Sequence, residues 1–252
     1  MKLPHLPLSL LLVFVCLFSV DAQKRRSGNR AKAPVPVKSH EVGRSAVVID
    51  ETLSLLRTRP SLFAESLQRM RRGRRVQILG AADADGVKFF KISAASGYAG
   101  WLQSDAVFGK FRMGDEERFA QLVQAADGFD QIELADAFFA MYPTSRFRPP
   151  ILLLFGDLVE NAAAKLSKDA NSRLSRREMA ATGAPVHSYY LNFNMLDRYR
   201  RTGITFLFNS STRNFHYDGA SWKEIVQKFP TSSEAAEAGR RLDSLRVKLD
   251  KQ

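Results

Sequence analysis

The sequence is poor in cysteine and histidine, and this scarcity limits the chemistry available to it. Its 252 residues include one cysteine and four histidines. Cys16 lies in an apolar N-terminal run that we expect to be removed, which would leave no disulfide, thiolate ligand or cysteine nucleophile. His187 and His216 have no second histidine four residues away and no carboxylate at metal-ligand spacing. We therefore predict neither a metal site nor a cofactor.

Recognisable catalytic motifs are also missing. The chain has no Gly-x-Ser-x-Gly, no His-Glu-x-x-His and no glycine-rich phosphate loop. Asp157 and Glu160 are three positions apart on an expected helix, where solvated surface acids explain them better than a catalytic pair. The sequence therefore predicts a protein that is not an enzyme.

Neither disorder nor a fibrous repeat fits the composition. About 45% of the residues are hydrophobic and 25% are charged, which is ordinary for a folded chain. The length suits one large domain or two modest ones. Lys and Arg number 38 against 26 Asp and Glu, so the formal net charge is +12. This excess indicates an anionic partner somewhere.

Residues 1–22 have the layout of a secretory signal peptide. Lys2 precedes an apolar run from Leu8 to Val20, and Val20 and Ala22 occupy the −3 and −1 positions of a cleavage site. A run of about 13 residues is short for a membrane-spanning helix. An uncleaved N-terminal anchor is the alternative. We expect export from a bacterial cell, to the periplasm or the extracellular space.

Residues 23–45 are expected to form a basic disordered linker. They contain seven Lys or Arg, a single acid and few large apolar residues, so they cannot bury enough surface to fold alone. The linker is either a solvated spacer or a tether to an anionic envelope polymer or lipid headgroups. Because the positive charge is concentrated here on an exported chain, the anionic envelope is a better expected target than sequence-specific nucleic acid.

Residues 46–110 are expected to form a small β domain. Short runs rich in β-formers alternate with turn signals such as Gly73 and the polar stretch 82–86. The expected strands are 46–49, 53–57, 74–80, 87–92 and 98–102.

The order of these pieces resembles a bacterial SH3 (SH3b) domain over the whole of this segment. The matching elements are Leu56-Arg57-Thr58-Arg59-Pro60-Ser61, Gly73 to Leu79, Phe89-Phe90-Lys91-Ile92 and Gly100-Trp101-Leu102. Two positions depart from the family: Arg59 replaces a usual glycine, and Phe89-Phe90 replaces a common Trp-Tyr pair.

The resemblance implies a non-catalytic, SH3-like barrel that binds a cell-wall polymer or an extended peptide. The ligand-binding candidates it implies are Phe89, Phe90, Tyr98 and Trp101. The alternative is that most of these aromatic side chains fill the core. Because successive strand residues face opposite ways, we expect at most one of Phe89 and Phe90 to be in the core.

Five arginines are crowded into seven positions before an expected strand. They are Arg69, Arg71, Arg72, Arg74 and Arg75. Because these like charges repel one another, the arginines must either be solvated around a turn at Gly73 or be opposed by anions. The planar guanidinium suits phosphate in particular, so the cluster is our candidate anion-binding site.

Residues 112–252 have helical periodicity and an internal repeat. Two similar junctions, Tyr142-Pro143-Thr144-Ser145 and Phe229-Pro230-Thr231-Ser232, interrupt the expected helices. These junctions resemble those of tetratricopeptide-like repeats in periplasmic assembly proteins, and the resemblance implies a helical array that binds a protein partner. Alternating apolar residues around 209–213 predict a β-hairpin, either a recognition element or a lid over the repeat core.

The expected fold class is multidomain: a small all-β SH3-like barrel, then an α-helical TPR-like repeat domain with an inserted β-hairpin. The expected function is non-catalytic binding or scaffolding in the cell envelope. Two alternatives remain open. One is a non-specific anionic-polymer binder acting through the linker and Arg69–Arg75; the other is an accessory subunit of an envelope enzyme.

Overall fold

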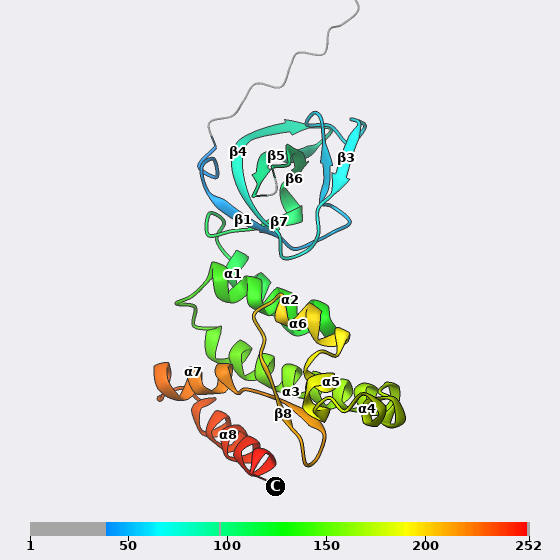
Figure 1. Cartoon of the computed structure of the whole chain (residues 1–252). Coiled ribbons are helices and arrows are strands. Elements are labelled where there is room, and N and C mark those ends of the chain that lie inside the picture. The colour runs from blue at the N-terminus through cyan, green and yellow to red at the C-terminus, as the bar shows by residue number, and fades with distance from the viewer. Residues whose placement is uncertain (1–38, 96, 251–252) are drawn as a thin grey trace, which may run out of the picture. The chain divides into compact units, whose positions relative to one another are not determined.

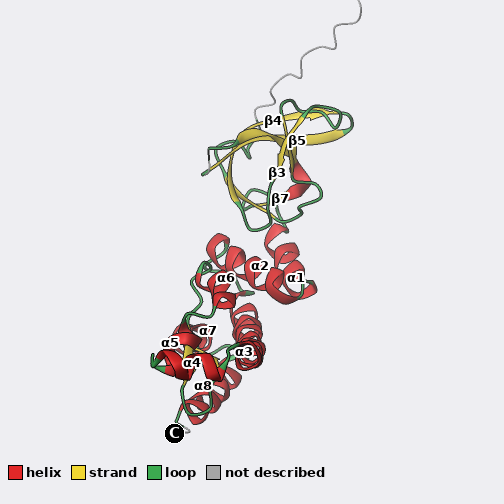
Figure 2. Ribbon diagram, turned by 45° about the vertical axis from the view of Figure 1, so that its right-hand side comes forward, coloured by secondary structure: helices red, strands yellow, loops and turns green. Residues whose placement is uncertain are grey.

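The computed structural model describes residues 39–95 and 97–250 (Figure 1). The expected signal peptide and the linker up to residue 38 lie outside the described residues. Within the described part of the chain, no helix has both the length and the apolar character needed to cross a membrane. This part combines an antiparallel sheet with helices: strands are concentrated in its first half and helices in its second (Figure 2).

Seven strands form one antiparallel sheet that curls around an apolar interior (Figure 1). The sheet order is β3-β2-β6-β5-β4-β1-β7. The strands are β1 (Ser45–Val48), β2 (Leu55–Arg57), β3 (Ser66–Arg69), β4 (Arg75–Ala84), β5 (Val87–Ala94), β6 (Ala99–Gln103) and β7 (Val107–Phe108). Every second side chain along a strand points into the interior, where it joins one apolar cluster. The cluster includes Leu56, Ile78, Ile92 and Leu102.

The hairpin of β4 and β5 is longer than the sequence pattern predicts. Asp85 and Gly86 both have positive φ angles, 53° and 73°, and they alone make the turn. Such a two-residue turn matches the right-handed twist of the strands it joins. Ala82 and Ala84 therefore continue β4 and pair with β5, where we expected a polar turn.

The expected linker boundary at residue 45 is wrong. Glu41 is 3% exposed, and its carboxylate lies 2.5 Å from the Nζ of Lys88 on β5. The N–H of Gly43 bonds to the carbonyl of Ile78 at 2.8 Å. Residues from Ser39 onward thus pack on the sheet. The sequence did not indicate this, because the partner of Glu41 is Lys88, which is far away in the chain.

Eight α-helices follow the sheet in the described residues. They are α1 (Asp115–Ala125), α2 (Gly128–Met141), α3 (Arg148–Arg173), α4 (Arg176–Thr182), α5 (Val186–Leu191), α6 (Asp197–Arg200), α7 (Ala220–Lys228) and α8 (Ala235–Leu249). The helices pack in the order α1, α2, α3, α7 and α8. Helices α4 to α6 and a hairpin are inserted between α3 and α7.

The two sequence junctions have the same backbone structure. Tyr142 and Phe229 end α2 and α7, and each donates its N–H to the carbonyl four residues before it. Ser145 and Ser232 then donate their N–H to the carbonyls of Tyr142 and Phe229, at 3.2 and 3.0 Å. The two junctions therefore share their local backbone structure, but the described helices do not form a series of tetratricopeptide repeats.

The predicted hairpin is present and packs on the helical core. Strands β8 (Phe206–Asn209) and β9 (Asn214–Tyr217) are antiparallel. Phe215 is 1% exposed, and its N–H bonds to the Oγ of Ser167 on α3 at 2.7 Å. Tyr217 is 3% exposed. The hairpin thus covers the core, as the lid interpretation predicts.

Helix α7 approaches α3 closely only because residue 156 is glycine. A Cβ at Gly156 would lie 2.2 Å from the Nε1 of Trp222 and 2.6 Å from the Oγ of Ser221. Trp222 is 2% exposed, so its indole cannot move into solvent.

We expect Gly156→Ala to lower the free energy of unfolding by about 2–3 kcal/mol through overpacking. The matched control is Gly239→Ala on α8, where a Cβ meets nothing within 4 Å. This control should stabilise the protein by roughly 0.5–1 kcal/mol through helix propensity. Chemical denaturation measures both variants, and equal effects would contradict the packing argument.

Candidate functional site

Phe89 and Phe90 are both fully buried, so the expectation that at most one of them is in the core is wrong. Phe90 points into the interior cluster of the sheet. Phe89 points the other way, and it too has 0% exposure. Near this end of the hairpin, the carboxylate of Asp85 accepts hydrogen bonds from the Oγ of Ser61 and the N–H of Leu62, at 2.6 and 2.8 Å. These bonds tie the segment 58–65 to the turn of the hairpin. Alternation along a strand predicts which face a side chain is on, and not whether that face is exposed.

Trp101 and Tyr98 remain at the surface. Tyr98 is 50% exposed in the turn before β6, and Trp101 is half-buried on the outer face of β6. Register places Trp101 directly between Lys91 on β5 and Arg57 on β2. Paired residues share a face, so the indole lies in a row between two cations. Its N–H has no hydrogen-bond partner among residues 39–95 and 97–250.

Gly100 determines how close β6 comes to β2. A Cβ at this position would lie 2.8 Å from the carbonyl oxygen of Arg57 and 2.8 Å from the Cγ of Leu56. The glycine in the Gly-Trp-Leu motif is therefore required for strand packing. It positions the neighbouring Trp101 beside Arg57.

The segment 58–65 adds an exposed aromatic residue that the sequence analysis missed. The Nη1 of Arg57 donates to the carbonyl of Ala64 at 2.8 Å, which ties the end of this segment to β2. Phe63 is 88% exposed. A phenylalanine shortly after the turn residues Pro60 and Ser61 is the signal that could have identified it.

Two of the five clustered arginines have structural partners. The Nη1 of Arg69 donates to the carbonyls of Glu51 and Thr52, at 2.6 and 2.9 Å. Arg72 forms an ion pair with Asp130 on α2 at 3.2 Å. The guanidinium of Arg69 therefore joins β3 to the turn before β2, and that of Arg72 joins the sheet domain to α2.

The other three, Arg71, Arg74 and Arg75, line an open hollow of about 640 Å³. Glu51 and Glu133 line the same hollow. Burial raises the pKa of Glu133, as do the nearby carboxylates of Asp130 and Glu51, while Arg71 and Arg72 oppose the shift. The protein's own carboxylates thus offset part of the positive charge that the sequence presents here.

The described residues contain no group of three His, Cys, Asp or Glu side chains that could hold a metal ion. Asp157 and Glu160 are partnered rather than simply solvated. Asp157 binds Arg241 at 2.9 Å, and Glu160 binds Lys248 at 2.7 Å. Both pairs connect α3 to α8 and stabilise the helical packing.

Comparison with known proteins adds no assignment: no protein-family model, no curated protein and no solved structure matches this chain. Exposed or half-buried aromatic side chains occur on the outer face around Trp101 and on the segment 58–65 that Arg57 ties to β2. We call this surface the Trp101 face.

Proposed function

We propose that this protein is an exported, non-catalytic binding protein of the bacterial cell envelope. Its SH3b-like sheet would bind a cell-wall polymer or an extended peptide at the Trp101 face. Its tetratricopeptide-like helices would hold a protein partner, and that partner could be an envelope enzyme for which this chain is an accessory subunit.

The observation that carries the proposal is the row of Lys91, Trp101 and Arg57 across three strands. An indole with a free N–H offers both an apolar face and a donor, which suits sugar rings and extended peptides. The flanking cations favour ligands that carry carboxylates. Phe63, 88% exposed on the segment that Arg57 ties to β2, and Tyr98, 50% exposed in the turn before β6, are further aromatic side chains open to a ligand.

The helical spacing supports the second half of the proposal. Helices α1 and α3 begin at Asp115 and Arg148, and the equivalent junctions precede α3 and α8. The first spacing is close to the period of about 34 residues that is typical of tetratricopeptide repeats. The later period is longer because α4 to α6 and the hairpin are inserted between α3 and α7.

Co-sedimentation of the purified protein with isolated peptidoglycan tests the first half. We expect the protein to pellet at moderate salt, and Trp101→Ala to weaken binding roughly tenfold or more, as the loss of a central aromatic anchor does. Phe63→Ala, at a more exposed position, should weaken it less. Thermal melting checks that both variants remain folded.

The matched control is Met113→Ala, because Met113 is fully exposed outside the Trp101 face. It should bind as the unchanged protein does. Failure of the unchanged protein to pellet at either low or moderate salt would refute the cell-wall assignment. Folded Trp101→Ala and Phe63→Ala variants that bind normally would refute the Trp101 face.

A second candidate function is non-specific binding of an anionic polymer. It is favoured by Arg71, Arg74 and Arg75, which have no side-chain hydrogen bond or ion pair in the described part of the chain. Such binding would fall steeply with salt through counterion release. The triple variant R71A/R74A/R75A should abolish it, whereas the Trp101 face would be unaffected.

A further inference from the structure

A second basic region lies in the inserted helices, where the sequence analysis proposed no site. Residues 173–201 contain six arginines and only two acids, Glu178 and Asp197. The side chains of Arg173, Arg176 and Arg177 form no hydrogen bond or ion pair with any described residue. Arg72 has Asp130 as its partner, whereas the part of the chain that the structure describes offers these three arginines no ion pair. Within that part, their charge is available to an external anion.

An uncharged, exposed stretch separates these arginines from the next ones in the chain. Residues 180–187 contain no Asp, Glu, Lys or Arg, and every one of them is exposed. Val186 is 42% exposed and Leu191 is 38% exposed. Exposed aliphatic side chains in a row of small, uncharged residues suit an apolar environment better than water.

Contacts hold α5 against the end of α3, which carries Arg173. Tyr190 on α5 donates its hydroxyl to the Oδ1 of Asn171 on α3 at 2.7 Å. A guanidinium nitrogen of Arg200 donates to the carbonyl of Leu191. One open groove of about 660 Å³ is lined by Arg173 at the end of α3, by Ala184 before α5 and by Tyr189 on α5. Figures 1 and 2 both show α4 and α5 side by side.

We propose that this α4–α5 surface, residues 173–191, docks on an anionic phospholipid bilayer. The arginines would meet lipid phosphates, each contributing roughly fivefold to the partition coefficient. Val186 and Leu191 would enter the headgroup boundary, as the apolar side chains of peripheral proteins do. A soluble polyanion would leave those aliphatic side chains without a role, which is why a bilayer fits better.

Sedimentation with vesicles tests the proposal on the full chain. Vesicles of phosphatidylglycerol and phosphatidylcholine should bind the protein, and pure phosphatidylcholine vesicles should not. R173A/R176A/R177A should lower the partition coefficient roughly 100-fold. V186S/L191S, which leaves the charge unchanged, should lower it several-fold.

The matched control, R71A/R74A/R75A, removes the same charge from the other arginine cluster. It should keep most of the binding, which separates a docking surface from a general effect of net charge. All these positions are exposed. Circular dichroism tests whether each variant is folded.

Three results would overturn the proposal. The first is no binding to anionic vesicles at low salt. The second is an equal loss in the two triple-arginine variants. The third is unchanged binding by V186S/L191S together with full competition by inorganic polyphosphate, which would identify a soluble polyanion as the partner.

Discussion

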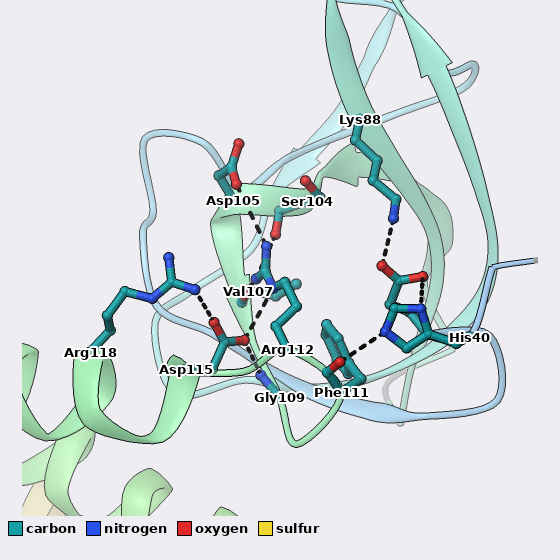
Figure 3. Close-up of polar contacts among 11 residues, drawn as sticks. His40, Lys88, Ser104, Asp105, Val107, Gly109, Phe111, Arg112, Asp115 and Arg118 are labelled. Atoms are coloured by element: carbon teal, nitrogen blue, oxygen red, sulfur yellow. Dashed lines mark hydrogen bonds and ion pairs between the residues drawn. The ribbon is translucent and has the colours of Figure 1, made fainter.

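Asp115→Ala is expected to lower the free energy of unfolding by about 3–5 kcal/mol. Asp115 has 0% exposure and opens helix α1. Its carboxylate accepts the N–H of Gly109 at 3.0 Å, the Nε of Arg112 at 3.1 Å and an Nη of Arg118 at 2.6 Å (Figure 3). A buried charge with three charged or polar partners is costly to remove, because each partner then loses its bond.

Arg112 connects Asp115 to β7, the last strand of the sheet. Its guanidinium also donates to the carbonyls of Ser104 and Val107, while its side chain is 22% exposed (Figure 3). Asp115 and Arg112 together therefore join the end of the sheet to the start of α1. Loss of the carboxylate leaves the guanidinium and the N–H of Gly109 without their anionic partner.

Asp105→Ala is the matched control for this prediction. Asp105 lies 3.6 Å from the same Arg112, but its side chain is 71% exposed. A solvated pair of this kind contributes about 0–1 kcal/mol. Urea denaturation compares the two variants. If both variants lost a similarly small free energy of unfolding, the burial of Asp115 would not strengthen its contribution to stability, and the prediction would be wrong.

Lowering the pH is expected to protonate Glu160 and thereby to lower the free energy of unfolding by up to about 3 kcal/mol. Burial alone would raise the pKa of this carboxyl. Hydrogen bonds from His216, Lys248 and the N–H of Tyr217 outweigh burial and lower the pKa to about 2. The distances to these partners are 3.1, 2.7 and 2.8 Å.

The direction of the pH effect follows from the lowered pKa. In the unfolded chain a glutamate protonates near its ordinary value, so the stabilisation is complete above about pH 4.5. It is lost progressively as the pH falls from there toward about 2. At neutral pH, Glu160→Gln should cost about 2–3 kcal/mol, since the hairpin, α3 and α8 share this one carboxylate.

Denaturation at pH 7 and pH 3 measures this effect. Glu160→Gln should lose less stability than the unchanged protein between these two values. Asp243→Asn, at a side chain that is 72% exposed, is the control and should behave as the unchanged protein does. An acid-induced loss that is the same with and without Glu160 would contradict the prediction.

Sequence patterns over a few residues predicted most of the helices and strands, but not which elements pack against one another. The two Pro-Thr-Ser junctions and the hairpin at 206–217 could be predicted because each depends on residues close in the chain. The edge strand β3 was missed, since Ser66–Arg69 has no alternating apolar pattern and is mostly exposed. Its place in the sheet comes from pairing with β2.

The candidate site was predicted in part. Trp101 was identified from its motif, and its flanking residues became visible only through strand register. Phe89 was misjudged because alternation along a strand predicts the face of a side chain but not its burial. The arginine cluster was visible in the sequence, whereas the acids of α2 that face it come much later in the chain.

The sequence by itself determined the order of the parts: the β-rich segment, the helical segment, the repeated junctions and the excess of positive charge. Each depends on composition or on neighbours within a few residues. Only the tertiary structure decided which charges are used internally. It pairs Arg72 with Asp130 and Arg241 with Asp157, yet gives Arg173, Arg176 and Arg177 no ion-pair partner within residues 39–95 and 97–250. Charge neutralisation depends on distances of a few ångströms, and folding sets those distances between residues that the sequence keeps far apart.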